Sequence, residues 1–274
     1  MILEPLHRDD IAYFLELATG ENWVAETWEL EFLLSSFGQG CFAARTDAGE
    51  TTGFVTSLRH DRSAWIGNLI VSPAHRGKGI GEALFKTALE GLQNGGIDTV
   101  WLTASKAGMP LYQKFGFTRI DTIIRWSGGG RKRRDSQETE EPLDTPDGEL
   151  ADLDGEAWGD LRENLLSATT GRGTVIWLKS GFAVIQPGRD AWQLGPFSAP
   201  GYSSADAVLK SALLAIPNGA PVCLDMPAAN RSACLLYARN RMRICGSNEL
   251  MYAGVAPQYR PELIYGLATM GSCG

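Results

Sequence analysis

The stretch that decides the fold reads Val71-Ser-Pro-Ala-His75-Arg76-Gly77-Lys78-Gly79-Ile80-Gly81-Glu82. It joins an apolar segment with strand character to a segment whose apolar residues have helical spacing. Its glycines allow a tight turn in which several backbone N–H groups point into one concavity at the start of the helix. The helix dipole also favours an anion there. The stretch therefore predicts a phosphate or pyrophosphate site between a strand and a helix.

Spacing excludes two other phosphate-binding loops. A P-loop needs Ser or Thr after Gly-Lys, and here Gly79 follows Lys78. The dinucleotide-binding pattern needs a third glycine where Leu84 stands. Tight packing without a ligand is the alternative explanation of the glycines, but the cationic Arg76 and Lys78 among them favour an anion site.

Apolar periods and turn residues place further elements on both sides of this loop. They predict helices over 10–18, 28–34 and 82–92 and a helix that ends at 115–117, with strands at 41–44, 53–58, 64–71 and 99–102. Residues 128–148 are rich in glycine and charge and almost lack apolar residues, which is typical of a linker. The basic run 131–134 inside it is interpreted as part of a solvated hinge, with a nucleic-acid or peptide contact as the alternative.

The same order of elements returns after the linker. Three segments of the second half match segments of the first, namely 181–183 with 53–55, 207–210 with 83–86, and 222–224 with 100–102. In addition, Tyr237 lies five residues before Met242, as Tyr112 lies five residues before Phe117. We therefore expect an internal duplication, with coincidence of common α/β patterns as the alternative. The predicted domains are 1–127 and 149–274, joined by the linker 128–148.

The composition argues against a membrane protein, a metalloprotein and a nucleic-acid-binding protein. The 274 residues are 44% hydrophobic and 21% charged, which is typical of a globular protein of about two domains. No apolar run is long enough to cross a membrane and no secretory signal is evident, so we expect a cytoplasmic protein without a membrane partner. The five cysteines and three histidines lack metal-binding spacing, so no metal is expected. The net charge of −7 argues against nucleic acid as a partner.

Two motifs carry a resemblance to a known family. Arg76, Gly79 and Gly81 match the acyl-CoA loop of the GNAT superfamily of N-acetyltransferases, Arg/Gln-x-x-Gly-x-Gly/Ala. The segment Leu111-Tyr-Gln-Lys-Phe-Gly-Phe117 is similar to that family's Leu-Tyr-x-Lys-x-Gly-Phe signature. The resemblance extends over residues 2–125, and 149–274 resembles the C-terminal halves of bacterial tandem GNAT proteins. It implies an α/β (α+β) fold of two tandem domains, each with a mixed, mostly antiparallel central sheet flanked by helices.

The resemblance also implies roles for the matching positions. Loop amides would hold the pyrophosphate of acetyl-CoA, the strand edge at 69–71 would contact its pantetheine arm, and Tyr112 would protonate the departing thiolate as general acid. A core tyrosine is the alternative for Tyr112. The expected cofactor-binding residues are Leu69, Ile70, Val71, Arg76, Gly77, Lys78, Gly79, Ile80, Gly81, Ser105 and Tyr112.

The general base and the acceptor site are less well defined. Many family members use a glutamate on the fourth strand, but residues 65–71 contain no acid. Glu26, Glu29, Glu31 and Asp225 remain the candidate bases, acting either directly or through water. The expected acceptor-side residues are Trp23, Trp28, Asn68 and Asp225, with core packing as the alternative for the tryptophans.

The second half has lost most of the loop. Alignment of the two halves places 200–205 opposite 76–81, so the arginine and two of the three glycines are missing. We therefore expect this half not to bind CoA there, but to close over the first domain and supply part of an acceptor pocket, or to complete a hydrophobic interface.

The resulting expectation is an N-acetyltransferase that transfers acetyl from acetyl-CoA to a primary amine of a small molecule or amino acid, by direct attack in a ternary complex. The acidic surface mildly favours a cationic acceptor. A non-catalytic acyl-CoA sensor, or an acetyltransferase for protein lysines or N-termini, is the alternative. A homodimer is left open.

Overall fold

The structure is a computed structural model that describes residues 1–132 and 148–274. Its strands are β1 (Ile2–Pro5), β2 (Phe42–Arg45), β3 (Thr51–Arg59), β4 (Ser63–Val71), β5 (Thr99–Ala104), β6 (Thr118–Gly129), β7 (Thr174–Leu178), β8 (Gly181–Gln186), β9 (Trp192–Ser198), β10 (Pro221–Pro227), β11 (Arg243–Gly254) and β12 (Ile264–Gly266). Its helices are α1 (Ile11–Gly20), α2 (Thr27–Phe37), α3 (Ile80–Asn94), α4 (Met109–Lys114), α5 (Glu149–Trp158), α6 (Glu163–Arg172), α7 (Tyr202–Ala215) and α8 (Arg231–Arg239). The predicted succession of elements is found in both halves, and the first half begins with an additional strand, β1, that was not predicted.

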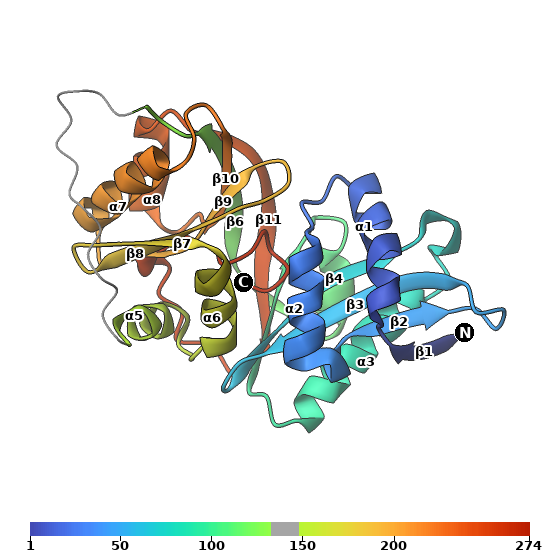
Figure 1. Cartoon of the computed structure of the whole chain (residues 1–274). Coiled ribbons are helices and arrows are strands. Elements are labelled where there is room, and N and C mark those ends of the chain that lie inside the picture. Colours follow the sequence, from blue (N-terminus) through green and yellow to red (C-terminus); the bar gives the residue numbers. More distant parts are fainter. Residues whose placement is uncertain (133–147) are drawn as a thin grey trace.

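The two halves share one sheet and exchange a strand. The strand order is β1-β2-β3-β4-β5-β11-β6-β10-β9-β8-β7, and β12 pairs with β9. β11, near the C-terminus, lies beside β5. β6 from the first half lies beside β10 of the second (Figure 1). The order is nearly symmetric about the β11–β6 pair, as an internal duplication predicts. The sheet is mixed and mostly antiparallel, as expected, with β4–β5 and β9–β10 as parallel pairs.

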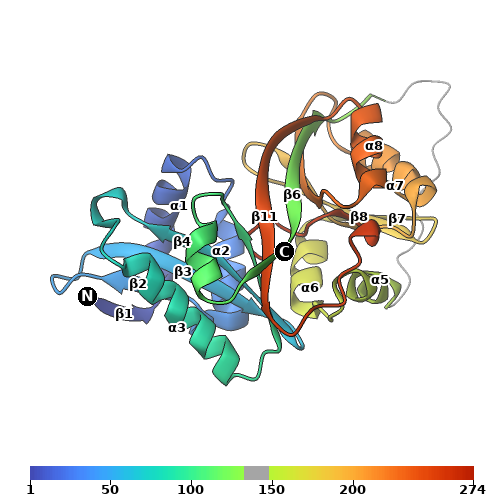
Figure 2. The same cartoon turned by 180° about the vertical axis from the view of Figure 1, so that it is seen from behind.

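Helices cover both faces of the first half because its strands alternate their side chains. In β3, Phe54 packs with Phe14 and Leu30 of α1 and α2, whereas the next residue, Val55, packs with Leu84 of α3. α1 and α2 therefore lie on one face, and α3 and α4 lie on the other (Figures 1 and 2). The predicted apolar face of α3 is buried along its length, which fixes the N-terminus of this helix at the end of β4.

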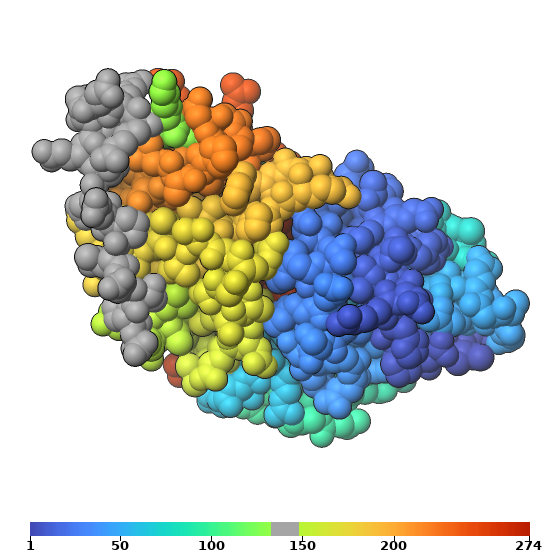
Figure 3. All heavy atoms as spheres, viewed as in Figure 1, coloured from blue at the N-terminus to red at the C-terminus, as the bar shows by residue number. Residues whose placement is uncertain are grey.

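The second half has the same layers and meets the first along an aromatic seam. α7 and α8 pack on one face of β8–β10, and α5 and α6 pack on the other. Trp158 of α5 packs edge-on against Trp65 and Trp101 of the first half, with centroid distances of 6.0 and 5.7 Å. Arg172 of α6 lies 4.1 Å from the Trp28 ring of α2. Figure 3 shows the blue surface of the first half against the yellow surface of the second.

Because of the strand exchange, the first residues of the expected linker belong to the sheet. Residues 128 and 129 are the last two of β6, where they pair with 222 and 221 of β10. Arg131, expected in a solvated hinge, instead donates hydrogen bonds to the side chain and the backbone carbonyl of Asn240 after α8. Residues 133–147 of the expected linker lie outside the described residues. The domain boundaries at 127 and 149 stay a prediction.

Candidate active site

Two neighbouring strands separate at the centre of the first half. β4 and β5 pair only at 63–65 with 99–101, although β4 continues to Val71. A bulge interrupts the pairing of β4 with β3 at Asn68, whose φ is 55° and whose amide Nδ2 donates to Thr56 Oγ1 at 3.1 Å. The edge of β4 from Ile66 to Val71 therefore has no partner strand on the β5 side in the described chain. Such an edge presents backbone groups to an extended, amide-containing ligand.

The glycine-rich loop lies at the end of this free edge. Gly77 and Gly79 have φ values of 74° and 78°, a conformation that residues with a side chain rarely adopt. The backbone N–H groups of 77–79 have no acceptor among the described residues. The first N–H groups of α3 also lack intrahelical partners, as in any α-helix. These amides form a cradle for an anion, as the sequence predicts.

Charged side chains surround the cradle. Arg76 Nε donates to the Val71 carbonyl at 3.0 Å, and its guanidinium pairs with Glu21. Lys78 Nζ instead donates to the Ala74 carbonyl at 3.2 Å. Arg76 is thus held beside the end of β4 and can supply charge at the rim of the cradle.

A cavity of about 640 Å³ joins the free edge of β4 to the cradle. Of the expected cofactor residues, those that line it are Leu69, Val71, Arg76, Gly77, Gly79, Ile80, Gly81, Ser105 and Tyr112. Of the expected acceptor residues, Trp23 and Asn68 line it. Ile70, Lys78, Trp28 and Asp225 do not. Ile70 packs in the core on the α1–α2 face, and Trp28 lies at the seam under Arg172.

Tyr112 lies in the cavity wall, on α4 and within the signature segment 111–117. Its ring packs against Phe85 of α3 at a centroid distance of 4.9 Å. Burial raises the pKa of Tyr112 to about 12, so the phenol is protonated at neutral pH. Its hydroxyl has no hydrogen-bond partner among the described residues, which leaves it available to a ligand in the cavity.

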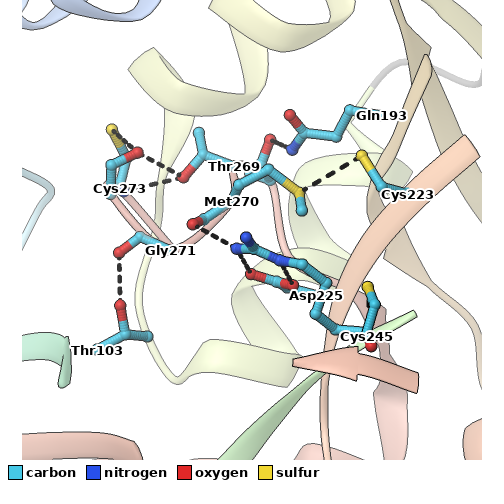
Figure 4. Close-up of polar contacts among 12 residues, drawn as sticks. Thr103, Gln193, Cys223, Asp225, Cys245, Thr269, Met270, Gly271 and Cys273 are labelled. Atoms are coloured by element: carbon cyan, nitrogen blue, oxygen red, sulfur yellow. Dashed lines mark hydrogen bonds and ion pairs between the residues drawn. The ribbon is translucent and has the colours of Figure 1, made fainter. Parts of the chain in front are cut away.

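The C-terminal segment closes the other end of the cavity, and the sequence analysis predicted none of its residues at the site, although it expected the second half to close over the first. Met270, Gly271 and Ser272 line the cavity, and Thr103 of β5 donates to the Gly271 carbonyl at 2.7 Å (Figure 4). A Cβ atom at Gly67 of β4 would collide with the Ser272 carbonyl. The segment therefore lies between the separated ends of β4 and β5. No sequence motif marks this segment, because its position depends on contacts between residues far apart in the chain.

An ion pair stands behind this segment. Arg125 of β6 binds both carboxylate oxygens of Asp225 of β10, at 2.8 and 2.7 Å, and also donates to the Met270 carbonyl at 3.0 Å. Arg125 lines the cavity, and so does Asn248 of β11. The charge in the run Ile-Ile-Arg-Trp at 123–126 was the available sequence signal for Arg125. Asp225, expected at the acceptor side, does not line the cavity and instead binds Arg125, which does.

The comparisons with known proteins agree with this geometry. Two family models, each for a GNAT acetyltransferase domain, match residues 38–119 and 150–266, which together make up well over half of the chain. The chain belongs to the GNAT family of acetyltransferases. It contains two such domains in tandem, as the motifs predict.

Solved structures show the tandem GNAT fold over the whole chain. The chain is similar to a candidate acetyltransferase from Pyrococcus horikoshii, with a TM-score of 0.86 and 23% identity over 100% of this chain and 95% of the other. It is also similar to a GCN5-related N-acetyltransferase from Sphaerobacter thermophilus, with a TM-score of 0.66 and 18% identity over 94% and 98%. A GCN5-related N-acetyltransferase from Anabaena variabilis has a TM-score of 0.57 at 13% identity, over 92% and 72%. At these identities the likeness concerns the fold.

In the second GNAT domain, the chain itself fills the position that corresponds to the free edge of β4. β12 pairs with β9, the counterpart of β4, and the Leu267 N–H next to it donates to the Asp225 carbonyl of β10, at 2.8 Å. Tyr237, the counterpart of Tyr112, donates its hydroxyl proton to the Tyr265 carbonyl in β12. A ligand in this groove would have to displace β12. This supports the prediction that the second half does not bind CoA there.

The four candidate bases of the GNAT reaction all lie outside the cavity wall. Glu26 accepts a hydrogen bond from the Arg189 backbone, and Asp225 is held by Arg125. Glu31 is exposed on the solvent side of α2. Glu29 is buried, and burial raises its pKa to about 7. Its one side-chain partner among the described residues is the Cys273 thiol, at 3.6 Å. Proton removal directly by one of these carboxylates is therefore not supported.

Residues 1–132 and 148–274 contain no cluster of three or more His, Cys, Asp or Glu side chains that is arranged to hold a metal ion. None of their helices has both the length and the apolar character needed to cross a membrane.

Proposed function

We propose that the chain is an N-acetyltransferase that transfers the acetyl group of acetyl-CoA to a primary amine of a small molecule or amino acid. One observation carries the proposal. A single cavity joins the amide cradle at the start of α3, the free edge of β4 and the unpartnered Tyr112 hydroxyl. In this proposal, the three features would receive the pyrophosphate, the pantetheine arm and the sulfur of acetyl-CoA.

Each part of the cofactor has a chemical partner in this arrangement. The amides of 77–79 and the first turn of α3 would hold the pyrophosphate, with Arg76 at the rim. The backbone of 66–71 would pair with the amides of pantetheine as an added strand does. One N–H group of this edge would polarise the thioester carbonyl as negative charge develops on its oxygen.

In the proposed reaction, the neutral amine attacks the thioester carbonyl carbon. The C–N bond forms, the C–S bond breaks, and the Tyr112 hydroxyl gives its proton to the departing sulfur. The phenol then recovers a proton from solvent, and the nitrogen releases its extra proton to solvent. The free amine is taken from the fraction of acceptor that is unprotonated in solution, so the step requires no carboxylate in the cavity wall.

The closed end of the cavity supports a small acceptor. Residues 270–272 lie between β4 and β5, where a peptide would otherwise approach the thioester. A protein lysine or N-terminus would have to displace this segment. The part of the second domain that follows β12 thus contributes to the acceptor side, in line with the expectation that this domain closes over the first.

The test is to incubate the purified chain with acetyl-CoA and a library of amines and amino acids, and to follow thiol release and product masses. We expect an acceptor whose mass rises by one acetyl group, with stoichiometric release of free CoA. If CoA binds but no acceptor is modified, the proposal of a small-molecule acceptor is wrong, and a protein acceptor or a sensor of acyl-CoA becomes the better explanation.

A further inference from the structure

The acceptor end of the cavity contains a guanidinium with two free donors. Arg125 has five N–H groups, and its Nε and Nη2 groups are used by Asp225 and the Met270 carbonyl. The two N–H groups on Nη1 have no acceptor among the described residues. Nη1 is also absent from the buried polar atoms that lack a partner, so it retains accessible surface. Because Arg125 lines the cavity, this accessible group is available to an acceptor.

The position of this guanidinium is set before any ligand binds. Asp225 is only 2% exposed and holds Arg125 through two parallel hydrogen bonds, which is the most rigid geometry for an arginine. The side chain of Arg125 is itself 22% exposed. The paired donor edge of the guanidinium is used by Asp225, and Nη1 is left to give a charge-assisted hydrogen bond to an oxygen of a carboxylate.

The remaining lining favours the same chemistry. The acidic side chain that lines the described cavity is Glu82, which lies at the first turn of α3. Both oxygens of Asp225 are already occupied by Arg125. A second ammonium group on the acceptor would therefore find no free carboxylate near Arg125 in the described part of the chain.

A neutral polar group lies beside Arg125. Asn248 of β11 stands opposite Ile123 in the strand pairing, two residues from Arg125 along β6 and therefore on the same face. Asn248 also lines the cavity, and its side-chain amide has no partner among the described residues. It supplies a further donor for an oxygen of the acceptor.

We propose that the acceptor is a small amine with a carboxylate close to its amino group, as in an amino acid, and that Arg125 Nη1 binds this carboxylate. The inference rests on the proposed acetyltransferase function and names its substrate class. It replaces the cationic acceptor suggested by the net charge of −7, because that charge describes the whole surface, whereas the cavity wall determines which acceptor binds.

Matched acceptors test this inference. The panel contains L-amino acids, their primary amides and the corresponding decarboxylated amines, assayed with acetyl-CoA. We expect wild-type kcat/KM to be at least about tenfold higher for the acids, as expected for a site built around a charged hydrogen bond. Arg125→Lys keeps a cation beside Asp225 but has no second nitrogen to reach the acceptor, so it should remove this preference mainly through KM.

The control is Arg119→Lys on the same strand. Arg119 also pairs with a carboxylate, that of Glu249, but it does not line the cavity, so its replacement should leave the preference unchanged. CoA affinity should be the same in all three proteins. Equal use of acids and amides by the wild type, or a preference that survives Arg125→Lys, would overturn the inference.

A binding measurement separates this inference from the proposed function. N-acetyl amino acids and N-acetyl amino acid amides are titrated by calorimetry into the protein saturated with CoA. Binding of the acids that is lost in Arg125→Lys supports the carboxylate site even when no acceptor is acetylated, in which case only the proposed function fails. No binding, or equal binding of acids and amides, contradicts the carboxylate site.

Discussion

At the residue scale, two buried acids have raised pKa values but different surroundings. Tyr112 lines the cavity, and its hydroxyl is free to meet a ligand. Glu29 is 4% exposed and lies outside the cavity wall, next to the Cys273 thiol. The same physical cause, loss of hydration, raises both pKa values. The raised pKa keeps the Tyr112 phenol protonated, as a general acid requires. At Glu29 the same loss of hydration lowers the stability of the fold when the carboxyl group ionises.

Replacement of Tyr112 by phenylalanine tests the general acid. We expect kcat to fall by about a hundredfold or more, with CoA affinity within twofold of wild type, because only the hydroxyl is lost. The same change at Tyr237, the counterpart in the second domain, is the control and should leave kcat nearly unaltered. A Tyr112→Phe protein with wild-type kcat would show that the phenol does not donate the proton.

The raised pKa of Tyr112 also predicts a pH profile. The protonated phenol is the active form, and it is lost only as the pH approaches about 12. We therefore expect no fall in kcat between about pH 8 and about pH 10 from ionisation of this group. A falling limb in that range that disappears in Tyr112→Phe would contradict the raised pKa.

Glu29 predicts a pH-dependent stability. Its folded pKa is about 7 against a usual value of 4.5, so its stabilising effect is complete below about pH 4.5 and is lost as the pH rises to about 7. Glu29→Gln should therefore raise the free energy of unfolding by about 3 kcal/mol at pH 8 and by less than about 1 kcal/mol at pH 5. Urea denaturation at the two pH values measures this, with the exposed Glu31→Gln on the same helix as control. Equal effects at both pH values would show that Glu29 titrates normally.

At the element scale, the turn between β4 and α3 carries the proposed cofactor site. Gly79 has φ 78° at the start of α3, and Gly96 has φ 77° just beyond its end. A Cβ at either position would meet no atom within 4 Å, so the two sites differ in location rather than in packing. They form a matched pair that separates backbone strain from ligand contact.

Valine at each glycine tests the cradle. Both variants should lose about 1–2 kcal/mol of stability from the left-handed backbone. Only Gly79→Val should also weaken CoA binding, by at least tenfold, because relief of the strain rotates the loop amides away from the pyrophosphate. Calorimetry with CoA gives the affinities. Equal affinity of the two variants would place the pyrophosphate elsewhere.

At the scale of the whole molecule, the strand exchange makes the two GNAT domains mutually dependent. β6 finds its partners in β10 and β11, and β11 separates it from β5. Without the second half, β6 would lose both neighbours and the aromatic seam at Trp65 and Trp101 would be exposed.

Separate expression of the two parts tests this dependence. We expect residues 1–132 and 148–274 to be poorly folded alone and to form a stable, CoA-binding complex when produced together. Size-exclusion chromatography and circular dichroism of each preparation measure the outcome. A monomeric, cooperatively folded 1–132 fragment would show that β6 can pair within its own half.

The sequence by itself determined the local elements and the glycine-rich loop. Helical spacing marked α3, glycines marked the turn at 77–79, and repetition of the order of elements marked two copies of one fold. These features depend on residues close together in the chain, so a pattern reveals them. The short strand β1 was missed because its four residues show no alternation of exposed and buried positions.

Only the tertiary structure decided how the two copies combine. β6 has the same local pattern whether it pairs with its own half or with the other, so its exchange with β11 has no sequence signature. For the same reason, the sequence did not predict the proposed acceptor end of the cavity. There Arg125 meets Asn248 and residues 270–272, which lie well over a hundred positions later in the chain. Contacts between such distant residues depend on strand order and register, which packing of the whole chain selects.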